Sequence, residues 1–344
     1  MRAGVQAATL RRAGLSALGM LGVAAALLAA EGMTPARLWS AWLAGSGGGA
    51  GAGVVAAPDA AINPQHPWDA AYFPNPVLTT QDGTRVRFYD DLIKGKTVAI
   101  NTFFSVCTDV CPLSTAKMLE LQRRLGDRVG RDVFFYSLSV DPEHDTPASM
   151  KDYAQRYGVG PGWLFLTGKP EDIQLISRRM GLGMLQAESP RDAHSTTLMV
   201  GHEPSGQWMK HSSTDNPQFV AAMMGTFFGW KAEADAPDYR QAAALQITSG
   251  EFLFRNGCAA CHSIGEGDRI GPDLKDVAQR RDPVWLERFV REPDVLIDGG
   301  DPLAQALLQR YKGVRMPNLG LKPDEVAEIL TYIAARSAKV AQRP

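Results

Sequence analysis

Short apolar runs alternate with helical patterns through the middle of the chain. The runs at 97–104 and 133–140 have the length and composition of buried strands. Apolar positions at 113–125 recur at helical spacing. Two further helices, at 147–157 and 170–180, are expected on either side of a strand at 163–167. Strands that alternate with helices predict an α/β sheet domain, which places functional side chains at the carboxyl ends of its strands.

Two hairpins are expected at the margins of this sheet. One covers 78–88 and turns at Asp82-Gly83, and the other joins 195–201 to 207–210. A last helix is predicted at 217–228. From residue 242 onward strand signals vanish and the chain reads as helical to its end, including an amphipathic helix at 325–335. The pattern therefore predicts an α/β domain followed by an all-α domain.

The first thirty residues combine a basic start with a long uncharged run. Arg2, Arg11 and Arg12 precede an uncharged run at 13–30, which as a helix would span about 27 Å, just short of a hydrocarbon core of roughly 30 Å. The segment is either a cleaved signal peptide or a retained anchor with its basic end in the cytoplasm. We favour the anchor slightly. Both alternatives predict an exported protein on the periplasmic face, and the anchor would hold it in the inner membrane.

Composition and spacing divide the rest of the chain. Residues 31–60 include a Gly-rich stretch and are expected to act as a tether. The α/β domain is predicted at 61–230, a charged and Ala-rich linker at 231–243, and the helical domain at 244–341.

Composition narrows the function classes. Hydrophobic residues make up 45% of the chain and charged residues 21%, which excludes disorder throughout. Lys and Arg number 36 against 37 Asp and Glu, so the balance lacks the basic footprint of a nucleic-acid-binding protein. The four cysteines form two close pairs, one in each predicted domain, which suggests two redox or metal sites.

The second cysteine pair lies in Cys258-Ala259-Ala260-Cys261-His262. This C-x-x-C-H pattern is typical of covalent haem attachment, because two thiols one helical turn apart can meet the two vinyl groups while the histidine reaches the iron. A zinc half-site or a disulfide is the alternative, although no further Cys/His pair follows. Met316 is the only methionine in 251–344 and is therefore the candidate for the second axial ligand.

This region resembles a class I c-type cytochrome over about a hundred residues. Besides the attachment motif, the resemblance includes Ile270-Gly271-Pro272-Asp273-Leu274 and Met316-Pro317-Asn318. It implies one covalent haem c, with the Pro272 carbonyl accepting a hydrogen bond from His262. It also implies that Tyr332 on the closing helix packs against the first helix near Gly250 and Phe254.

The first cysteine pair, Cys107 and Cys111, stands where a strand is expected to turn into a helix. Pro112 suits the first helical turn, and Cys111 would lie near the helix N-terminus, whose dipole favours the thiolate. Two thiolates on one face suit Cu(I), with an imidazole completing a three-coordinate site. The same pair could instead close a disulfide or be buried and inert.

Five histidines outside the helical domain could supply that imidazole. His194 is favoured because it directly precedes the strand expected beside the one that leads to Cys107. His202 and His211, on the following hairpin, are reserve candidates. His66 and His144 complete the set.

The α/β region resembles the Sco (SenC) family of copper-binding, thioredoxin-fold proteins over roughly 61–230. The matching segments are Cys107-x-x-x-Cys111-Pro112, the stretch from Ser139-Val140-Asp141-Pro142-Glu143 through His144-Asp145-Thr146-Pro147, and Asp192-Ala193-His194-Ser195. The resemblance implies one copper bound by Cys107, Cys111 and His194, and a role in delivering copper to, or reducing, the copper site of a respiratory oxidase. Thr108 replaces a common proline, and Gly201-His202 replaces an Asp at a strand end.

Three functions remain open at this point. The first is an exported copper-binding and electron-transfer protein that assists assembly or reduction of a respiratory oxidase copper site, with the oxidase copper subunit or another redox protein as its partner. The second is a thiol–disulfide oxidoreductase that uses Cys107 and Cys111 and passes electrons to its haem, and the third is a redox sensor. Only the second is an enzyme, and no catalytic residue beyond the two thiols is assigned.

Overall fold

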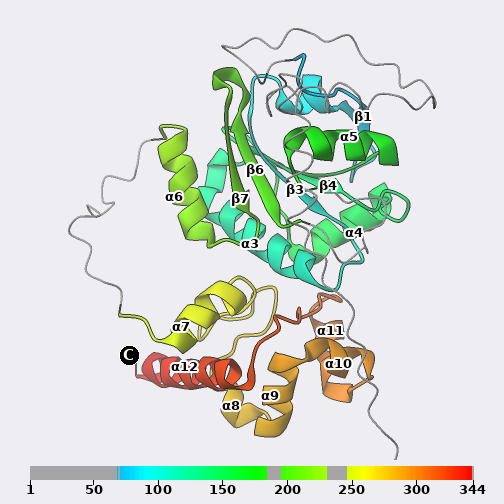
Figure 1. The fold of residues 1–344 in the computed structure, drawn as a ribbon. Helices are drawn as coiled ribbons and strands as arrows, with labels where there is room; N and C mark the ends of the chain where they lie inside the picture. The colour runs from blue at the N-terminus through cyan, green and yellow to red at the C-terminus, as the bar shows by residue number, and fades with distance from the viewer. Residues whose placement is uncertain (1–67, 69, 184–194, 231–245, 343–344) are drawn as a thin grey trace, which may run out of the picture. The chain divides into compact units, whose positions relative to one another are not determined.

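The computed structural model describes residue 68 and residues 70–183, 195–230 and 246–342 (Figure 1). The predicted signal or anchor at 1–30, the tether at 31–60 and the linker at 231–243 lie outside these residues. So does His194. Among the described helices, none combines the length and apolar character needed to cross a membrane.

One mixed sheet organises the α/β domain, in the order β2-β1-β5-β4-β3-β6-β7. Its centre is parallel, since β3 pairs with β4 and β4 with β5 in the same direction. The outer pairs β1·β2, β1·β5, β3·β6 and β6·β7 are antiparallel. The strands are β1 Val77–Thr80, β2 Arg85–Arg87, β3 Thr97–Phe103, β4 Phe134–Ser139, β5 Trp163–Thr167, β6 Thr197–His202 and β7 Gln207–Ser212.

Helices cover both faces of this sheet. Alternate residues of β3 point to opposite sides: Ala99 and Phe103 belong to the apolar cluster with α3, α4 and α6, whereas Val98 and Ile100 belong to the cluster with α5 and a π-helical turn. A strand buried on both faces explains the continuous apolar run in the sequence. The helices are α3 Val110–Leu125, α4 Pro147–Tyr157, α5 Pro170–Met180 and α6 Pro217–Phe227, and the π-helical turn is Phe88–Ile93.

Local signals explain where the helices begin and end. The Thr146 hydroxyl caps α4 by accepting a hydrogen bond from the Ser149 backbone N–H at 3.2 Å, and Pro147 occupies the first turn. Gly158 ends α4 in the left-handed conformation. The predicted bounds of this helix are therefore confirmed, as are those of α5 and β5. The π-helical turn Phe88–Ile93 was not predicted: the hairpin was expected to end at Phe88, and no element was assigned to 89–93.

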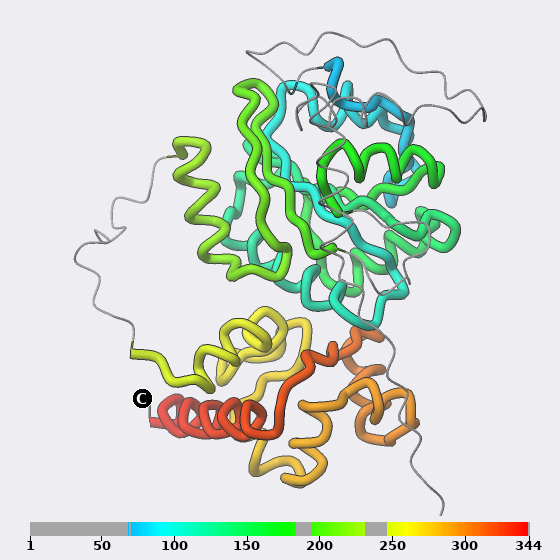
Figure 2. The backbone as a smooth tube through the Cα atoms, in the orientation of Figure 1, coloured from blue at the N-terminus to red at the C-terminus, as the bar shows by residue number. Residues whose placement is uncertain are grey.

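Residues 246–342 form a separate helical region, traced as a tube in Figure 2, and no strand occurs within them. The predicted helix at 325–335 is longer, running as α12 Pro323–Ala341. It packs on α7 so closely that a Cβ at Gly250 would lie 2.1 Å from the Glu328 carbonyl oxygen, and the Phe254 and Tyr332 rings are 5.4 Å apart. This confirms the contact that the cytochrome resemblance implies. The remaining elements are α7 Ser249–Leu253, the π-helical turn Phe254–Cys258, α8 Val277–Arg280, α9 Pro283–Arg291, α10 Pro293–Asp298 and α11 Pro302–Arg310.

Candidate metal and haem sites

Cys107 and Cys111 lie together beyond the carboxyl end of β3. Cys107 is in the turn that leaves the strand, where its N–H donates to the Phe104 carbonyl at 3.2 Å, and Cys111 is in the first turn of α3. Both are buried, at 7% and 2% exposure, in a small apolar cluster with Phe104. The partly buried Val140 packs against this cluster. Neither forms a disulfide in this structure.

The pKa of Cys111 is shifted in the direction opposite to the one expected from the sequence. The hydrogen bond with Cys107 and burial raise the pKa of the Cys111 thiol well above its usual value. The expected lowering by the helix N-terminus is therefore wrong, because desolvation and the neighbouring thiol outweigh the dipole. A thiol with a raised pKa forms the nucleophilic thiolate less readily, and a metal must displace its proton to bind.

A buried carboxylate lies under the same turn. Asp145 Oδ1 accepts hydrogen bonds from the Ser105 N–H at 3.0 Å and the Ser105 hydroxyl at 2.5 Å, and Asp145 Oδ2 accepts one from the Ser139 hydroxyl at 2.5 Å. Ser139 ends β4 and pairs with Phe103, the last residue of β3. Asp145 thus joins the ends of two parallel strands just before Cys107. Asp145 belongs to the segment 139–147 that resembles the Sco family, but the sequence predicts no role for it, because an acidic residue in a loop gives no sign of burial.

His194 lies outside the described residues, but the residue that follows it is described. Ser195, the next residue, accepts a hydrogen bond through its carbonyl from the Thr102 hydroxyl at 3.3 Å. Thr102 is the penultimate residue of β3. The chain therefore resumes after His194 at the end of β3 that leads to Cys107. The prediction that the following strand lies beside β3 is confirmed by the β3·β6 pairing.

The reserve histidines lie elsewhere on the sheet. His202 pairs with Thr97, at the amino end of β3 and opposite to the cysteines, so its candidacy as a ligand was wrong. His211 is on β7, one strand further out, with its Nε2 3.1 Å from Met209 Sδ. His144 follows β4, and its Nδ1 is 2.8 Å from an Asp141 carboxylate oxygen.

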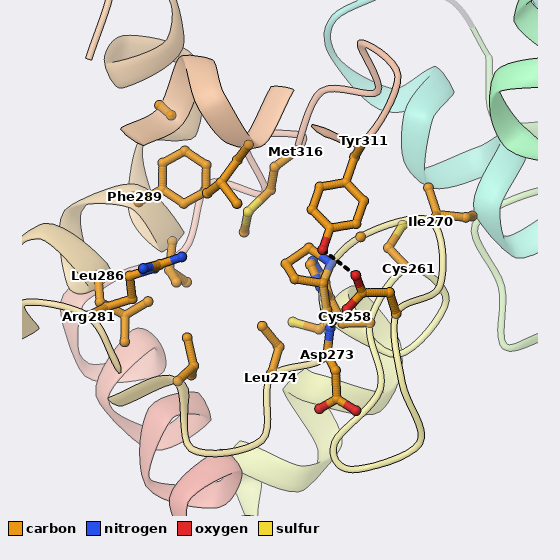
Figure 3. Close-up of a pocket in the computed structure, with 18 of the residues that line it drawn as sticks. Cys258, Cys261, Ile270, Asp273, Leu274, Arg281, Leu286, Phe289, Tyr311 and Met316 are labelled. Atoms are coloured by element: carbon orange, nitrogen blue, oxygen red, sulfur yellow. Dashed lines mark hydrogen bonds between the residues drawn. The ribbon is translucent and has the colours of Figure 1, made fainter. Parts of the chain in front are cut away.

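The helical region encloses a cavity of about 470 Å³. Figure 3 shows Cys258 and Cys261 on one wall, with Met316 approaching from the opposite side. His262 also lines it, and burial raises the pKa of the Cys258 thiol to about 12. Most of the remaining wall is apolar and includes Ile270, Leu274, Leu286, Phe289 and Ile329.

His262 is oriented by a single backbone contact. Its Nδ1 donates to the Pro272 carbonyl at 2.9 Å, since a carbonyl can only accept. This leaves Nε2 as the nitrogen with a lone pair for iron, and confirms the hydrogen bond that the cytochrome resemblance implies. Gly271 permits the approach, because a Cβ there would lie 2.6 Å from His262 Cε1.

The segment that carries Met316 is fixed from its downstream side. The Asn318 side-chain amide donates to Asp294 on α10 at 2.9 Å, and Asn318 Oδ1 accepts the Gly320 N–H at 2.9 Å. Two thiols, an imidazole nitrogen and a thioether sulfur thus converge on one apolar cavity. This donor set fits a covalently attached haem with His/Met ligation.

Comparisons with known proteins agree with this division. The SCO1/SenC family model matches residues 71–225 and the cytochrome c model matches residues 247–337. The SCO1 protein homolog of Bacillus subtilis is 38% identical over 135 residues, which are 38% of this chain and 67% of that protein. A candidate copper-binding protein of Stutzerimonas stutzeri is 30% identical over 141 residues, 40% of this chain and 67% of that protein.

A solved structure is also similar. The crystal structure of a SCO1/SenC family lipoprotein from Bacillus anthracis shares 28% identity, covers 47% of this chain and 95% of that one, and has a TM-score of 0.40. These relatives align with the α/β domain.

Proposed function

Because the chain belongs to the SCO1/SenC family and carries a cytochrome c domain behind it, we propose that it binds one copper ion and exchanges single electrons through one covalent haem. Its role is to assist assembly or reduction of a respiratory oxidase copper site. The observation that carries this proposal is the pair of adjacent, buried thiols of Cys107 and Cys111.

These thiols suit metal binding better than disulfide exchange. Exchange needs an accessible thiolate to attack a partner's disulfide, whereas Cys111 is 2% exposed and its pKa is raised. Copper binding needs two soft donors side by side and releases one proton from each thiol. His194 is the third donor, since the chain enters β6 at the cysteine end of β3.

The second site suits single-electron transfer. The Pro272 carbonyl holds His262 in one tautomer, and Asn318 fixes the segment that presents Met316. When bound there, a His/Met haem supplies one-electron chemistry at a raised potential. Copper also changes by one electron, whereas a dithiol changes by two, so copper is the better match for a single haem.

The N-terminal residues support the location we propose. Three arginines before the uncharged run at 13–30 fit a segment that exports the protein and keeps it on the periplasmic face of the inner membrane. The partner there would be the copper subunit of a respiratory oxidase or another redox protein.

Copper stoichiometry in the haem-loaded full chain tests the proposal. We expect about one copper per chain, lost in Cys107→Ser and Cys111→Ser and greatly weakened in His194→Asn. His202→Asn is the matched control, because His202 lies at the opposite end of β3 and should leave copper binding unchanged. Wild-type protein that retains no copper against a weak chelator, or retains zinc equally well, would overturn the assignment.

A further inference from the structure

The side-chain carboxylate of Asp145 is buried close to the turn that carries Cys107, and its hydrogen-bond partners are neutral. Asp145 is 1% exposed, and its three hydrogen-bond donors are the N–H and hydroxyl of Ser105 and the hydroxyl of Ser139, all neutral. No Lys or Arg of the described segments pairs with it. The like charge of Asp141 contributes to raising the pKa of Asp145.

The directions of the hydrogen bonds indicate whether the Asp145 carboxyl group is ionised or protonated. The Ser139 hydroxyl accepts the Asp141 N–H at 3.1 Å, so its own proton points to Asp145 Oδ2. Ser105 directs both its protons to Oδ1. All the donors therefore point toward the carboxylate, which is the arrangement of an ionised group, even though burial raises the pKa of Asp145.

This charge acts at the cysteines. Ser105 is two residues before Cys107, and it is fixed to Asp145 through both its backbone and its side chain. The field of Asp145 also contributes to the raised pKa of Cys111. A buried carboxylate is costly without a counter-charge. Copper replaces the two thiol protons, so Cu(I) adds one negative charge to the site, whereas Cu(II) leaves its charge unchanged.

We propose that Asp145 is a positioning residue of the dithiol copper site, and that its fixed negative charge favours Cu(II) over Cu(I) and so directs electrons from copper to haem. Cu(II) carries one positive charge more than Cu(I), so a nearby anion stabilises it more. One electron leaves Cu(I), which becomes Cu(II), and reduces one ferric haem to ferrous haem, with no proton or bond exchanged. The inference rests on the proposed copper function.

The test compares the affinities of the haem-loaded full chain for the two ions. Cu(I) affinity is measured against bicinchoninate, and Cu(II) affinity against nitrilotriacetate. Asp145→Asn keeps the shape and one acceptor oxygen but removes the charge, so we expect the Cu(II)-to-Cu(I) affinity ratio to fall at least tenfold. The control Asp91→Asn removes a carboxylate that accepts the Arg87 N–H, far from the cysteines, and should leave the ratio within twofold.

A second variant tests the charge if Asp145→Asn does not fold. The hydrogen bond from the Ser139 hydroxyl lowers the pKa of Asp145, so Ser139→Ala weakens the hold on the charge and should lower the affinity ratio in the same direction by a smaller factor. An unchanged ratio in Asp145→Asn, or in Ser139→Ala where Asp145→Asn does not fold, would overturn the role of Asp145. Wild-type protein that binds neither ion would instead overturn the copper function itself.

Discussion

Single residues decide the chemistry of each site. At the haem site, Met316 is presented by a segment that Asn318 ties to α10. At the copper site, Asp145 and the buried thiols set the charge. All of these residues except Cys111 lie outside regular helices and strands, so their positions depend on specific hydrogen bonds. Substitutions there should change spectra and potentials more than they change the fold.

Met316→Ala should remove the second axial ligand of the haem. We expect the oxidised protein to lose the long-wavelength absorption of thioether bound to ferric iron, and the haem potential to fall. Leu319→Ala is the matched control, since Leu319 lines the same cavity without a donor atom. Survival of the absorption in Met316→Ala would show that another group binds the iron.

Asp273 should make the helical domain sensitive to acid. Burial alone would raise its pKa, but hydrogen bonds from the Gly265, Lys275 and Gly267 N–H groups and from Ser263 lower it from 3.8 to about 2. A lowered folded-state pKa gives stability that is present above the usual value and is lost as the pH falls toward 2.

The expected loss is about 1 kcal/mol, because solvent screens this partly exposed carboxylate. Urea unfolding followed at the haem between pH 5 and pH 2 measures it. Asp273→Asn should be less stable than wild type at pH 5 and should show a shallower decline. An equal decline in both proteins would contradict the assignment.

At the scale of elements, a tryptophan ring packs directly on a glycine near the edge of the sheet, so that position has no room for a larger residue. A Cβ at Gly201 on β6 would lie 2.0 Å from the Trp208 ring on β7, whereas a Cβ at Gly225 on α6 would meet nothing within 4 Å. Gly201→Ala should therefore destabilise the α/β domain by about 1–3 kcal/mol through forced displacement of the ring. Gly225→Ala, in a helix, should stabilise it by about 0.5–1 kcal/mol.

Chemical denaturation followed by tryptophan fluorescence and circular dichroism measures both changes. The two variants make the same chemical substitution, so opposite signs would isolate the effect of the Trp208 contact. A Gly201→Ala protein as stable as wild type would show that the ring moves aside without cost.

The elements also show what sequence patterns can and cannot predict. The parallel strands and the helices α4 and α5 were predicted closely because apolar periodicity, proline and glycine act locally. The C-x-x-C-H and C-x-x-x-C motifs located both sites for the same reason. The role of Asp145 and the raised pKa of Cys111 were not predicted, because both follow from burial between strands that are distant in sequence.

At the scale of the whole molecule, we propose that electrons pass between a copper site and a haem in the same chain. Both sites would change by one electron, and the charge of Asp145 would favour transfer from copper to haem. The predicted linker at 231–243 is short, so the two domains would share an effective concentration on the order of millimolar. Transfer within the chain should then compete with transfer to external partners.

Stopped-flow mixing of Cu(I) with the full chain carrying oxidised haem tests this claim most directly. With Cu(I) in saturating excess, so that binding does not limit the rate, we expect haem reduction at a rate independent of protein concentration. The reaction should be absent in the Cys107→Ser/Cys111→Ser protein, which retains the haem site. A rate that rises linearly with protein concentration, or reduction that persists in the double variant, would contradict coupling within the chain.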